Sequence, residues 1–353
     1  MQNIYRIIDA NLNRAREGLR IIEDCARFAL NAPVISSQAK SLRSRLAAVA
    51  DAIGDDQLIR SRDNQGDTGT KITCPSEMTR RDLKQIVSAG CKRLEESLRT
   101  IEEYSKLVTP DQAAIAERMR YDSYILEQNI LGKLSVTTRL QEAKIYALIS
   151  SDMYLGDLCK LAEEIISAGV DVIQLREKSS TTDADFLRLA RTLKDITNKS
   201  GALLVINDRA DIASIVQADG LHLGQDDLPT HEVRRLLQPG TFIGRSCHSM
   251  EHVENELANG ADYIALGPMF TTATKDKKPV GPILLEQFVE KFGSDINNRP
   301  PVVVIGGINA SNADELSKKG ASCIAVCGEI IHAKNPQLAT KNLRDAFCKN
   351  TKR

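Results

Sequence analysis

The chain has 353 residues, with 47 Lys and Arg against 47 Asp and Glu and 42% hydrophobic residues, a composition typical of a globular protein. The balanced charge argues against binding to nucleic acid or to an anionic membrane, and no apolar run reaches the roughly 20 residues of a membrane-spanning helix. We therefore expect a cytoplasmic protein with no nucleic-acid or membrane partner, whose eight cysteines are reduced. At about 150 residues per domain, the length favours two domains.

Residues 1–138 are predicted to form an all-α helical domain, because apolar residues recur there at helical spacing. Within this region the segments 14–24 and 93–103 match position by position in their Arg, Glu, Leu and Ile residues. A duplicated helix explains the match. In each copy, charged side chains recur every third residue beside an apolar stripe, so the two copies could face each other.

The charged side chains of this repeat allow two interpretations. They could be solvated ion pairs on the outside of a helical bundle. Alternatively, most of the basic residues are arginines, whose guanidinium groups suit bidentate contacts with phosphate or carboxylate. The polar, glycine-containing segment 60–70 could cover an anionic ligand, but it lacks the spacing of a P-loop. Motif spacing alone therefore does not establish a phosphate site here.

From residue 139 to 353, short strands rich in Val, Ile and Leu alternate with helical segments. Eight strands are predicted, at 145–149, 170–175, 203–206, 220–223, 242–243, 263–266, 302–305 and 323–326. Eight strand–helix units predict an α/β fold of the (β/α)8 TIM-barrel type, with a doubly wound sheet as the alternative. The barrel is favoured because polar or glycine-containing motifs follow nearly every strand, where a barrel collects its active site.

The residues that follow the strands predict two anion sites. Arg176 and Lys178 follow the second strand and could hold a polyphosphate. Carboxylates follow the third strand, at Asp208, and the fourth, at Asp226 and Asp227. Such carboxylates suit a Mg²⁺ ion that takes its other ligands from substrate phosphate and water. Glycines after the seventh and eighth strands predict a phosphate cradle made of backbone N–H groups.

The acid–base chemistry of the region is less clear. His222 and His248 could each be a packed, hydrogen-bonded side chain or a base. The segment 267–281 is rich in Thr and Lys and resembles a mobile lid. Without a clear general base, a reaction that depends on stabilising a leaving group is favoured over a hydrolysis.

The motifs of residues 144–335, taken together, closely resemble those of thiamine-phosphate synthase, also called thiamine-phosphate pyrophosphorylase. They are QLREK (174–178), NDR (207–209), DGLHLGQDD (219–227), GRSCH (244–248), DYIALGPMFTTATK (262–275) and GGI (306–308). The resemblance implies a transferase that joins hydroxymethylpyrimidine diphosphate to thiazole phosphate, giving thiamine phosphate and pyrophosphate. In the family, pyrophosphate leaves first and the thiazole nitrogen captures the pyrimidine cation, which agrees with the lack of an obvious base.

The resemblance also implies a role for each matching position. The pyrimidine diphosphate would be held by Gln174, Arg176, Lys178 and Asn207, and Mg²⁺ by Asp208 and Asp227. The departing pyrophosphate would contact Ser246 and Lys275, which with Arg176 and Lys178 are the expected catalytic residues. The thiazole phosphate would contact Thr272, Thr274, Gly307 and the backbone of Cys327 and Gly328. The family often has Ser or Thr where Gly328 stands, so one hydroxyl contact is absent here.

Two alternatives remain for the barrel: a thiazole tautomerase of the same barrel family, and a phosphate-binding barrel without catalysis. The tautomerase would need neither a diphosphate nor a metal. The joint presence of Arg176, Lys178, Asp208, Asp227 and Lys275 favours the synthase.

The segment 8–20 resembles the helical domain found ahead of some thiamine-phosphate synthases, to which hydroxymethylpyrimidine-phosphate kinase activity has been assigned. This resemblance implies a bifunctional enzyme that also binds ATP. The candidate residues are Asn11, Arg14, Glu17, Arg20, Arg93 and Arg99. The alternative is a helical dimerisation or regulatory module, which need not bind ATP. The sequence leaves the oligomeric state open and allows a homo-oligomer.

Overall fold

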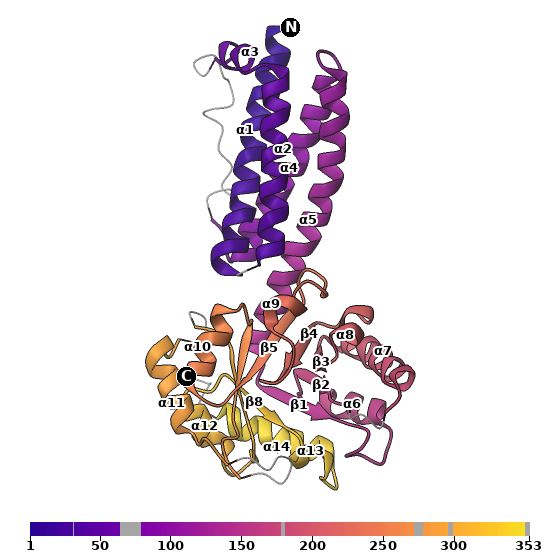
Figure 1. The fold of residues 1–353 in the computed structure, drawn as a ribbon, viewed down its shortest axis with the longest axis vertical. Helices are drawn as coiled ribbons and strands as arrows, with labels where there is room; N and C mark the ends of the chain where they lie inside the picture. The colour runs from indigo at the N-terminus through magenta and orange to yellow at the C-terminus, as the bar shows by residue number, and fades with distance from the viewer. Residues whose placement is uncertain (31, 64–78, 178–180, 272–277, 296–298, 350–353) are drawn as a thin grey trace. The chain divides into compact units, whose positions relative to one another are not determined.

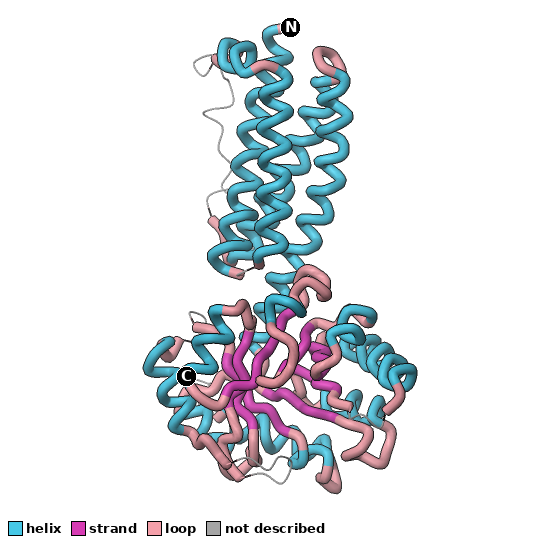
Figure 2. Tube along the Cα trace, viewed as in Figure 1, coloured by secondary structure: helices cyan, strands magenta, loops and turns pink. Residues whose placement is uncertain are grey.

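The computed structural model describes the whole chain except residues 31, 64–78, 178–180, 272–277, 296–298 and 350–353. The chain divides into two compact units, Met1–Ser135 and Val136–Arg353. The first unit is helical, and the strands lie in the second (Figure 2). The predicted fold class, a barrel preceded by an all-α region, is therefore confirmed. In the described part of the chain, no helix combines the length and the apolar character needed to cross a membrane.

The first unit is built from long helices that lie side by side (Figure 1). They are α1 (Gln2–Asp24), a short π-helical segment η1 (Cys25–Ala29), α2 (Pro33–Ile53), α3 (Asp55–Arg60), α4 (Leu83–Ser105) and α5 (Pro110–Glu142). Local signals set several of their ends. Pro33 opens α2, where its missing N–H costs nothing. The Asp82 side chain caps α4 by accepting a 2.7 Å hydrogen bond from the Gln85 N–H.

Helices α1 and α4, which carry the two copies of the repeat, pack against each other. The helices approach closely at Gly18, where an added Cβ would lie 2.7 Å from the Gly90 carbonyl oxygen. Leu12 and Leu19 of α1 and Leu94 of α4 are fully buried in the apolar core of this unit. The two copies of the repeat therefore build the centre of the helical unit.

The second unit is a closed barrel of eight parallel strands in sequential order, with β8 paired to β1 (Figure 1). The strands are β1 (Ile145–Ile149), β2 (Val172–Leu175), β3 (Leu203–Asn207), β4 (Gly220–Leu223), β5 (Phe242–Cys247), β6 (Tyr263–Leu266), β7 (Val302–Ile305) and β8 (Cys323–Val326). Strand β5 is longer than predicted. Ser246 pairs in register with Ala265 of β6, so it lies on the strand rather than in the loop that follows it.

Helices surround the barrel. They are α6 (Leu158–Ser167), α7 (Asp183–Ser200), α8 (Ala210–Ile215), α9 (Thr230–Val233), α10 (Met250–Ala258), α11 (Ile283–Phe292), α12 (Ala313–Lys318), α13 (Gly328–Ile331) and α14 (Pro336–Cys348). Their apolar faces and the outward side chains of the strands form one large core, in which Ile173, Leu204 and Phe288 are fully buried. Burial of this apolar layer is the main force that closes the barrel.

Three aspartates fix strand register at the amino-terminal end of the barrel. Each precedes an even-numbered strand and accepts a hydrogen bond from a backbone N–H at the start of the preceding strand. The distances are 3.0 Å from Ile145 N to Asp171, 2.8 Å from Leu204 N to Asp219 and 2.7 Å from Ile243 N to Asp262. Each carboxylate also pairs with a cation, from Arg344, Lys194 and Arg234 respectively. These contacts stabilise the end of the barrel away from the predicted site.

The barrel interior is filled by three aromatic rings, from Tyr146, Phe242 and Tyr263. Two glycines on the strands make room for them. A Cβ on Gly220 would lie 2.2 Å from the Phe242 ring, and a Cβ on Gly244 would lie 1.9 Å from Cζ of Tyr263. Glycine is therefore required at these two strand positions, although it weakens an ordinary strand.

Candidate active site

The predicted site residues that the structure describes lie at or just past the carboxyl ends of the barrel strands. In a closed parallel barrel these ends form one face, so the topology gathers residues that are far apart in sequence. The described members are Gln174, Arg176, Asn207, Asp208, Asp227, Ser246, Gly307, Cys327 and Gly328. Four predicted site residues, Lys178, Thr272, Thr274 and Lys275, lie outside the described residues.

The two predicted metal ligands follow neighbouring strands. Asp208 comes directly after β3, in a left-handed backbone conformation with φ of 61°, and its N–H donates to the His222 carbonyl oxygen at 2.9 Å. Left-handed geometry is costly for residues other than glycine and is seen often at functional sites. Oδ2 of Asp227 accepts a 2.6 Å hydrogen bond from the Gly224 N–H, which holds the carboxylate at the end of β4.

A chain of hydrogen bonds runs across the barrel interior to Ser246. Gln174 Nε2 donates to the Tyr146 hydroxyl oxygen at 2.7 Å, and that oxygen lies 3.0 Å from the Tyr263 hydroxyl. The Tyr263 hydroxyl lies 2.8 Å from His222 Nδ1, and His222 Nε2 lies 2.9 Å from Ser246 Oγ. The two ring nitrogens of His222 thus each have a hydroxyl partner.

Sequence reasoning missed Tyr146 and Tyr263 as part of the site. Both occupy inward positions of strands that otherwise read as apolar, Ile145–Ile149 and Tyr263–Leu266. A tyrosine hydroxyl buried in a barrel needs a hydrogen-bond partner, so a tyrosine at such a position is the signal that could have found them. Pairing the two tyrosines requires strand positions that only the closed barrel supplies.

The glycines after β7, where a phosphate cradle is predicted, have left-handed backbone conformations. Gly306 and Gly307 have φ of +105° and +65°, and a Cβ on Gly307 would lie 2.5 Å from the Thr271 carbonyl oxygen. Asn312 Nδ2 donates to the Gly307 carbonyl oxygen at 2.9 Å and so fixes the turn. Glycine is needed here because other residues rarely adopt positive φ.

After β8, Cys327 precedes α13, which begins at Gly328. Burial raises the pKa of the Cys327 thiol to about 11, although the charge of Arg176 acts in the opposite direction. Cys327 therefore contributes a neutral thiol, whose Sγ lies 3.7 Å from Sδ of Met153. A nucleophilic role for this cysteine is disfavoured, because the thiolate is the reactive form.

Two other charged or polar residues of the motifs have structural contacts. Arg209 of the NDR motif pairs with Asp183 and Asp211, each at 2.6 Å, and the hydrogen bonds that it donates to these carboxylates raise its pKa. These contacts tie Arg209 to the helices beside β3. His248 Nδ1 lies 2.5 Å from the Gly267 carbonyl oxygen, just past β6.

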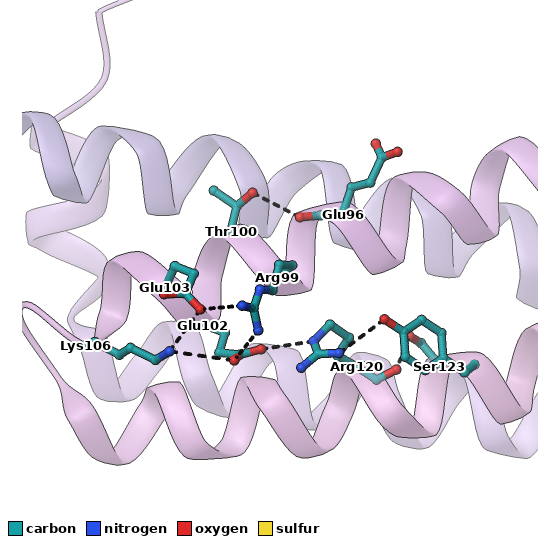
Figure 3. Close-up of polar contacts among 9 residues, drawn as sticks. Glu96, Arg99, Thr100, Glu102, Glu103, Lys106, Arg120 and Ser123 are labelled. Carbon is teal, nitrogen blue, oxygen red and sulfur yellow. Dashed lines mark hydrogen bonds and ion pairs between the residues drawn. The ribbon is translucent and has the colours of Figure 1, made fainter.

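In the helical unit, the repeat places a buried carboxylate at the same position of each copy. Glu102 of α4 is 3% exposed and lies 2.8 Å from Arg99, 3.0 Å from Arg120 of α5 and 3.8 Å from Lys106 (Figure 3). These contacts neutralise the buried carboxylate, as a buried charge requires.

The matching carboxylate of α1 is Glu23, which is also 3% exposed. It contacts Arg27 of η1 and Arg43 of α2. Arg20 and Asp24, by contrast, form an exposed pair at 3.5 Å. The charged repeat is therefore partly a solvated face and partly the ionic interior of the bundle.

The six candidate residues of the helical unit do not form one cluster of contacts. Asn11 is buried and donates to the Ile7 carbonyl oxygen at 2.8 Å, which is a contact within its own helix. Arg14, Glu17 and Arg93 are exposed. A cavity of about 610 Å³ lies between α2 and α5. Its lining, Pro33, Val34, Ser37, Gln38, Ser41, Leu42, Arg45, Asp122 and Ile125, includes none of the six.

Comparison with known proteins agrees with these two units. A model of the family described as thiamine monophosphate synthase matches residues 145–330, and a model of the ThiD2 family matches residues 6–129. Thiamine-phosphate synthases of Synechocystis sp. and Parasynechococcus marenigrum are each 38% identical to this chain, over 96% and 99% of its length and 95% and 97% of theirs.

A solved structure supports the assignment of the barrel. A thiamine phosphate pyrophosphorylase from Pyrococcus furiosus is 30% identical, covers 60% of this chain and 98% of its own, and aligns with a TM-score of 0.54. With relatives of this identity along nearly the whole sequence, the chain belongs to the thiamine-phosphate synthase family.

Proposed function

We propose that the barrel joins 4-amino-2-methyl-5-hydroxymethylpyrimidine diphosphate to thiazole phosphate and releases pyrophosphate, the transferase step that forms thiamine phosphate. The observation that carries this proposal is the gathering of Arg176, Asp208, Asp227 and Ser246 at one barrel face, with the glycine turn at Gly307. Such a face offers a cation, carboxylates for a metal and a backbone cradle for a second phosphate. A tautomerase would need only the cradle.

Mg²⁺ is the cofactor that we assign to this reaction. Asp208 and Asp227 would hold it, and the Gly224 N–H engages only Oδ2 of Asp227. Among the residues that the structure describes, no group of three or more His, Cys, Asp or Glu side chains is placed to hold a metal. Two carboxylates fit an ion that takes its remaining ligands from substrate phosphate and water. When bound, the ion would neutralise the developing charge of the leaving group.

In the proposed mechanism, the residues of the chain bind the two substrates and stabilise the leaving group. Gln174 and Asn207 would orient the pyrimidine, while Arg176 and Lys178 would bind its diphosphate. The bond between the pyrimidine methylene carbon and the diphosphate oxygen breaks, and pyrophosphate takes the electron pair while Ser246 and Lys275 donate to it. The thiazole nitrogen then gives its lone pair to the methylene carbon, so no general base is required.

The thiazole substrate would be bound through its phosphate. Thr272, Thr274, Gly307 and the backbone of Cys327 and Gly328 are the proposed contacts. The glycine turn at Gly306 and Gly307 supports this assignment, because it follows β7, where barrels of this type commonly bind phosphate.

For the helical unit, we propose phosphorylation of the pyrimidine monophosphate by ATP, which would supply the diphosphate that the barrel consumes. The match of residues 6–129 to the ThiD2 family and the exposed Arg14 and Arg93 support this role. Asn11, Glu17, Arg20 and Arg99 complete the candidate set. A dimerisation or regulatory module, in a homo-oligomer, is the alternative.

We further propose that the protein acts in the cytoplasm on small phosphorylated molecules. The seven cysteines in the described ranges are free, which is typical of a reducing compartment.

One experiment tests both activities. The full-length protein would be incubated with Mg²⁺, thiazole phosphate and either the pyrimidine diphosphate or the monophosphate, with and without ATP. Thiamine phosphate from the diphosphate alone is the expected barrel reaction, and its absence would refute the synthase proposal. Product from the monophosphate that requires ATP is expected of the kinase, and the variant R20E should lose only this reaction. If product forms from the diphosphate but not from the monophosphate with ATP, the helical unit is instead a structural or regulatory module.

A further inference from the structure

We propose that His222 is a positioning residue that holds the Ser246 hydroxyl as a hydrogen-bond donor toward the departing pyrophosphate. It does so as the last link of the buried chain that starts at Gln174 and passes through Tyr146 and Tyr263. The inference deepens the proposed synthase function and rests on it, because Ser246 is assigned there to the leaving group.

We assign the hydrogen-bonded chain a direction from the donor at its start, because the distances of the later links fit either donor. Gln174 presents Nε2, which can only donate, to the Tyr146 hydroxyl oxygen. The one proton of Tyr146 is then available for the Tyr263 oxygen, 3.0 Å away. In this direction Tyr263 gives its proton to His222 Nδ1, which lies 2.8 Å from the Tyr263 hydroxyl oxygen. Nδ1 then carries a lone pair, and the single ring proton of a neutral imidazole is on Nε2.

The tyrosines remain donors because they are buried. Desolvation raises the pKa of both Tyr146 and Tyr263 well above the ordinary value for tyrosine. Each hydroxyl therefore keeps its proton at neutral pH. The Tyr263 ring is also held in place, because it fills the space that Gly244 leaves and the Phe242 ring packs edge-on against it at 5.7 Å.

At the end of the chain, the direction decides what Ser246 can do. His222 Nε2–H donates to Ser246 Oγ at 2.9 Å, so the serine proton is not used within the chain and can be given to a ligand. In the reverse direction Ser246 would spend its proton on His222 and turn lone pairs toward the anion, which is repulsive. The main chain of Ser246 is held as well, since Gln225 Nε2 donates to its carbonyl oxygen at 2.6 Å.

The first test reads the tautomer of His222 directly. The full-length protein, labelled with ¹⁵N-histidine, would be examined by NMR without ligands, and H222Q would identify the His222 signals among the five histidines. The expected form is the neutral ring with its proton on Nε2. A ring protonated on Nδ1 would overturn the proposal. Y263F should remove the preference for the Nε2–H tautomer, because it deletes the hydrogen-bond donor to Nδ1 and keeps the ring that fills the barrel.

The second test measures whether His222 acts through Ser246. Binding of inorganic pyrophosphate with Mg²⁺ and kcat/KM for the pyrimidine diphosphate would be measured for H222M, S246A and the double variant. We expect H222M to weaken pyrophosphate binding by about 10-fold to 100-fold, the range for a hydrogen bond to a charged group. S246A should have a similar effect, and the double variant should be no worse than S246A. Additive losses would contradict the proposal.

Two further variants separate positioning from packing. H222Q keeps an N–H near the position of Nε2 and should recover part of the loss, whereas H231Q is a matched change at an exposed histidine and should have no effect. If H222M does not fold, Y263F replaces it in the same test. We expect Y263F to weaken pyrophosphate binding less than H222M, and to have no further effect when it is added to S246A. A loss in Y263F that persists in the S246A background would count against the chain.

These measurements also distinguish the failure of the inference from the failure of the proposed function. The tautomer and the binding of pyrophosphate need no turnover. If the tautomer is on Nε2 and the losses are not additive, but no thiamine phosphate forms, then the synthase proposal fails and the positioning of Ser246 stands. If product forms while His222 is protonated on Nδ1, the synthase proposal stands and the positioning of Ser246 by His222 fails.

Discussion

The two units of this protein bury polar groups for different purposes. In the helical unit, the buried carboxylate Glu23 is neutralised by two arginines. Glu102 is neutralised by arginine and lysine side chains (Figure 3). The barrel unit also buries an ion pair, Arg245 with Glu256 at 2.9 Å, but the buried groups that lead to its functional face are hydroxyls, an amide and an imidazole. These groups form a hydrogen-bonded chain that ends at Ser246, and the helical unit has no counterpart of it among the contacts of Glu23 and Glu102.

The comparison shows why burial of a polar residue does not by itself indicate function. Glu102 is 3% exposed and so more buried than His222 at 8%, but its partners Arg99 and Arg120 belong to the same helical unit and leave it no role toward a ligand. The hydrogen-bonded chain of the barrel ends at Ser246, at the carboxyl ends of the strands, where a ligand can accept the next hydrogen bond. Changes to the barrel site should therefore affect turnover, and changes to the helical interior should affect stability.

The largest expected effect is on turnover. D227A should lower kcat/KM of the Mg²⁺-dependent synthase reaction by about three orders of magnitude, because a carboxylate that holds the metal and its substrate phosphate is lost. Steady-state kinetics over a range of Mg²⁺ concentrations would measure it, and D208A should behave similarly. D226A, at the exposed neighbouring aspartate, is the matched control and should keep nearly full activity. Full activity in D227A would refute the metal assignment.

The next largest effect is on the barrel interior. G244A should destabilise the barrel by about 3 kcal/mol, at the upper end of the cost of overpacking, because the new Cβ would lie 1.9 Å from Cζ of Tyr263. Chemical denaturation followed by circular dichroism would measure it. The double variant G244A/Y263V removes the clashing ring and should regain part of the stability. If G244A unfolds at the same denaturant concentration as the unmodified protein, Tyr263 does not fill this space.

A smaller effect is expected in the helical unit, where neighbouring glutamates form a matched pair. E102A should destabilise this unit by about 2 kcal/mol, because Arg120 would lose its buried partner. E103A removes an exposed carboxylate of the same helix and should leave the unfolding midpoint almost unchanged. Both variants should keep full synthase activity with the diphosphate substrate. Equal destabilisation by the two changes would contradict the assigned role of Glu102.

The smallest effects are expected from two glycine-to-alanine changes, one at an open position of α5 and one at the contact between α1 and α4. Alanine is a better helix former than glycine, so G132A, where no atom lies within 4 Å of the added Cβ, should stabilise α5 by up to about 1 kcal/mol. G18A should instead destabilise the unit by about 1 kcal/mol, because its Cβ would lie 2.7 Å from the Gly90 carbonyl oxygen. Thermal unfolding of the two variants gives the sign of each change, and a stabilising G18A would refute the close approach.

Much of the barrel could be predicted because its signals are local. Each strand is a short apolar run, and the polar residues of the site follow directly in sequence, as Asn207 and Asp208 follow β3. The limits of β5 were less accurate, since Arg245 and Ser246 look like loop residues until the pairing with β6 extends the strand. Strand ends depend on the neighbouring strand, which a local pattern does not contain.

In the helical unit, the repeat was visible in sequence but its burial pattern was not. Glu23 and Asp24 are adjacent acidic residues, yet one is buried among arginines and the other is exposed. The difference depends on which neighbouring helix faces each residue, because Arg43 of α2 and Arg120 of α5 come from distant parts of the chain. A charged side chain can enter the interior only where such partners meet it.

The sequence by itself therefore determined the two-part architecture, the eight strand–helix units, the repeated helix and the set of polar residues at the strand ends. These follow from periodicity and from residue order, which the chain carries locally. Only the tertiary structure decided that Tyr146, Tyr263 and His222 connect Gln174 to Ser246, and that Gly244 must be a glycine. The physical reason is that hydrogen bonds and steric contacts within a closed barrel depend on the register of strands that lie far apart along the chain.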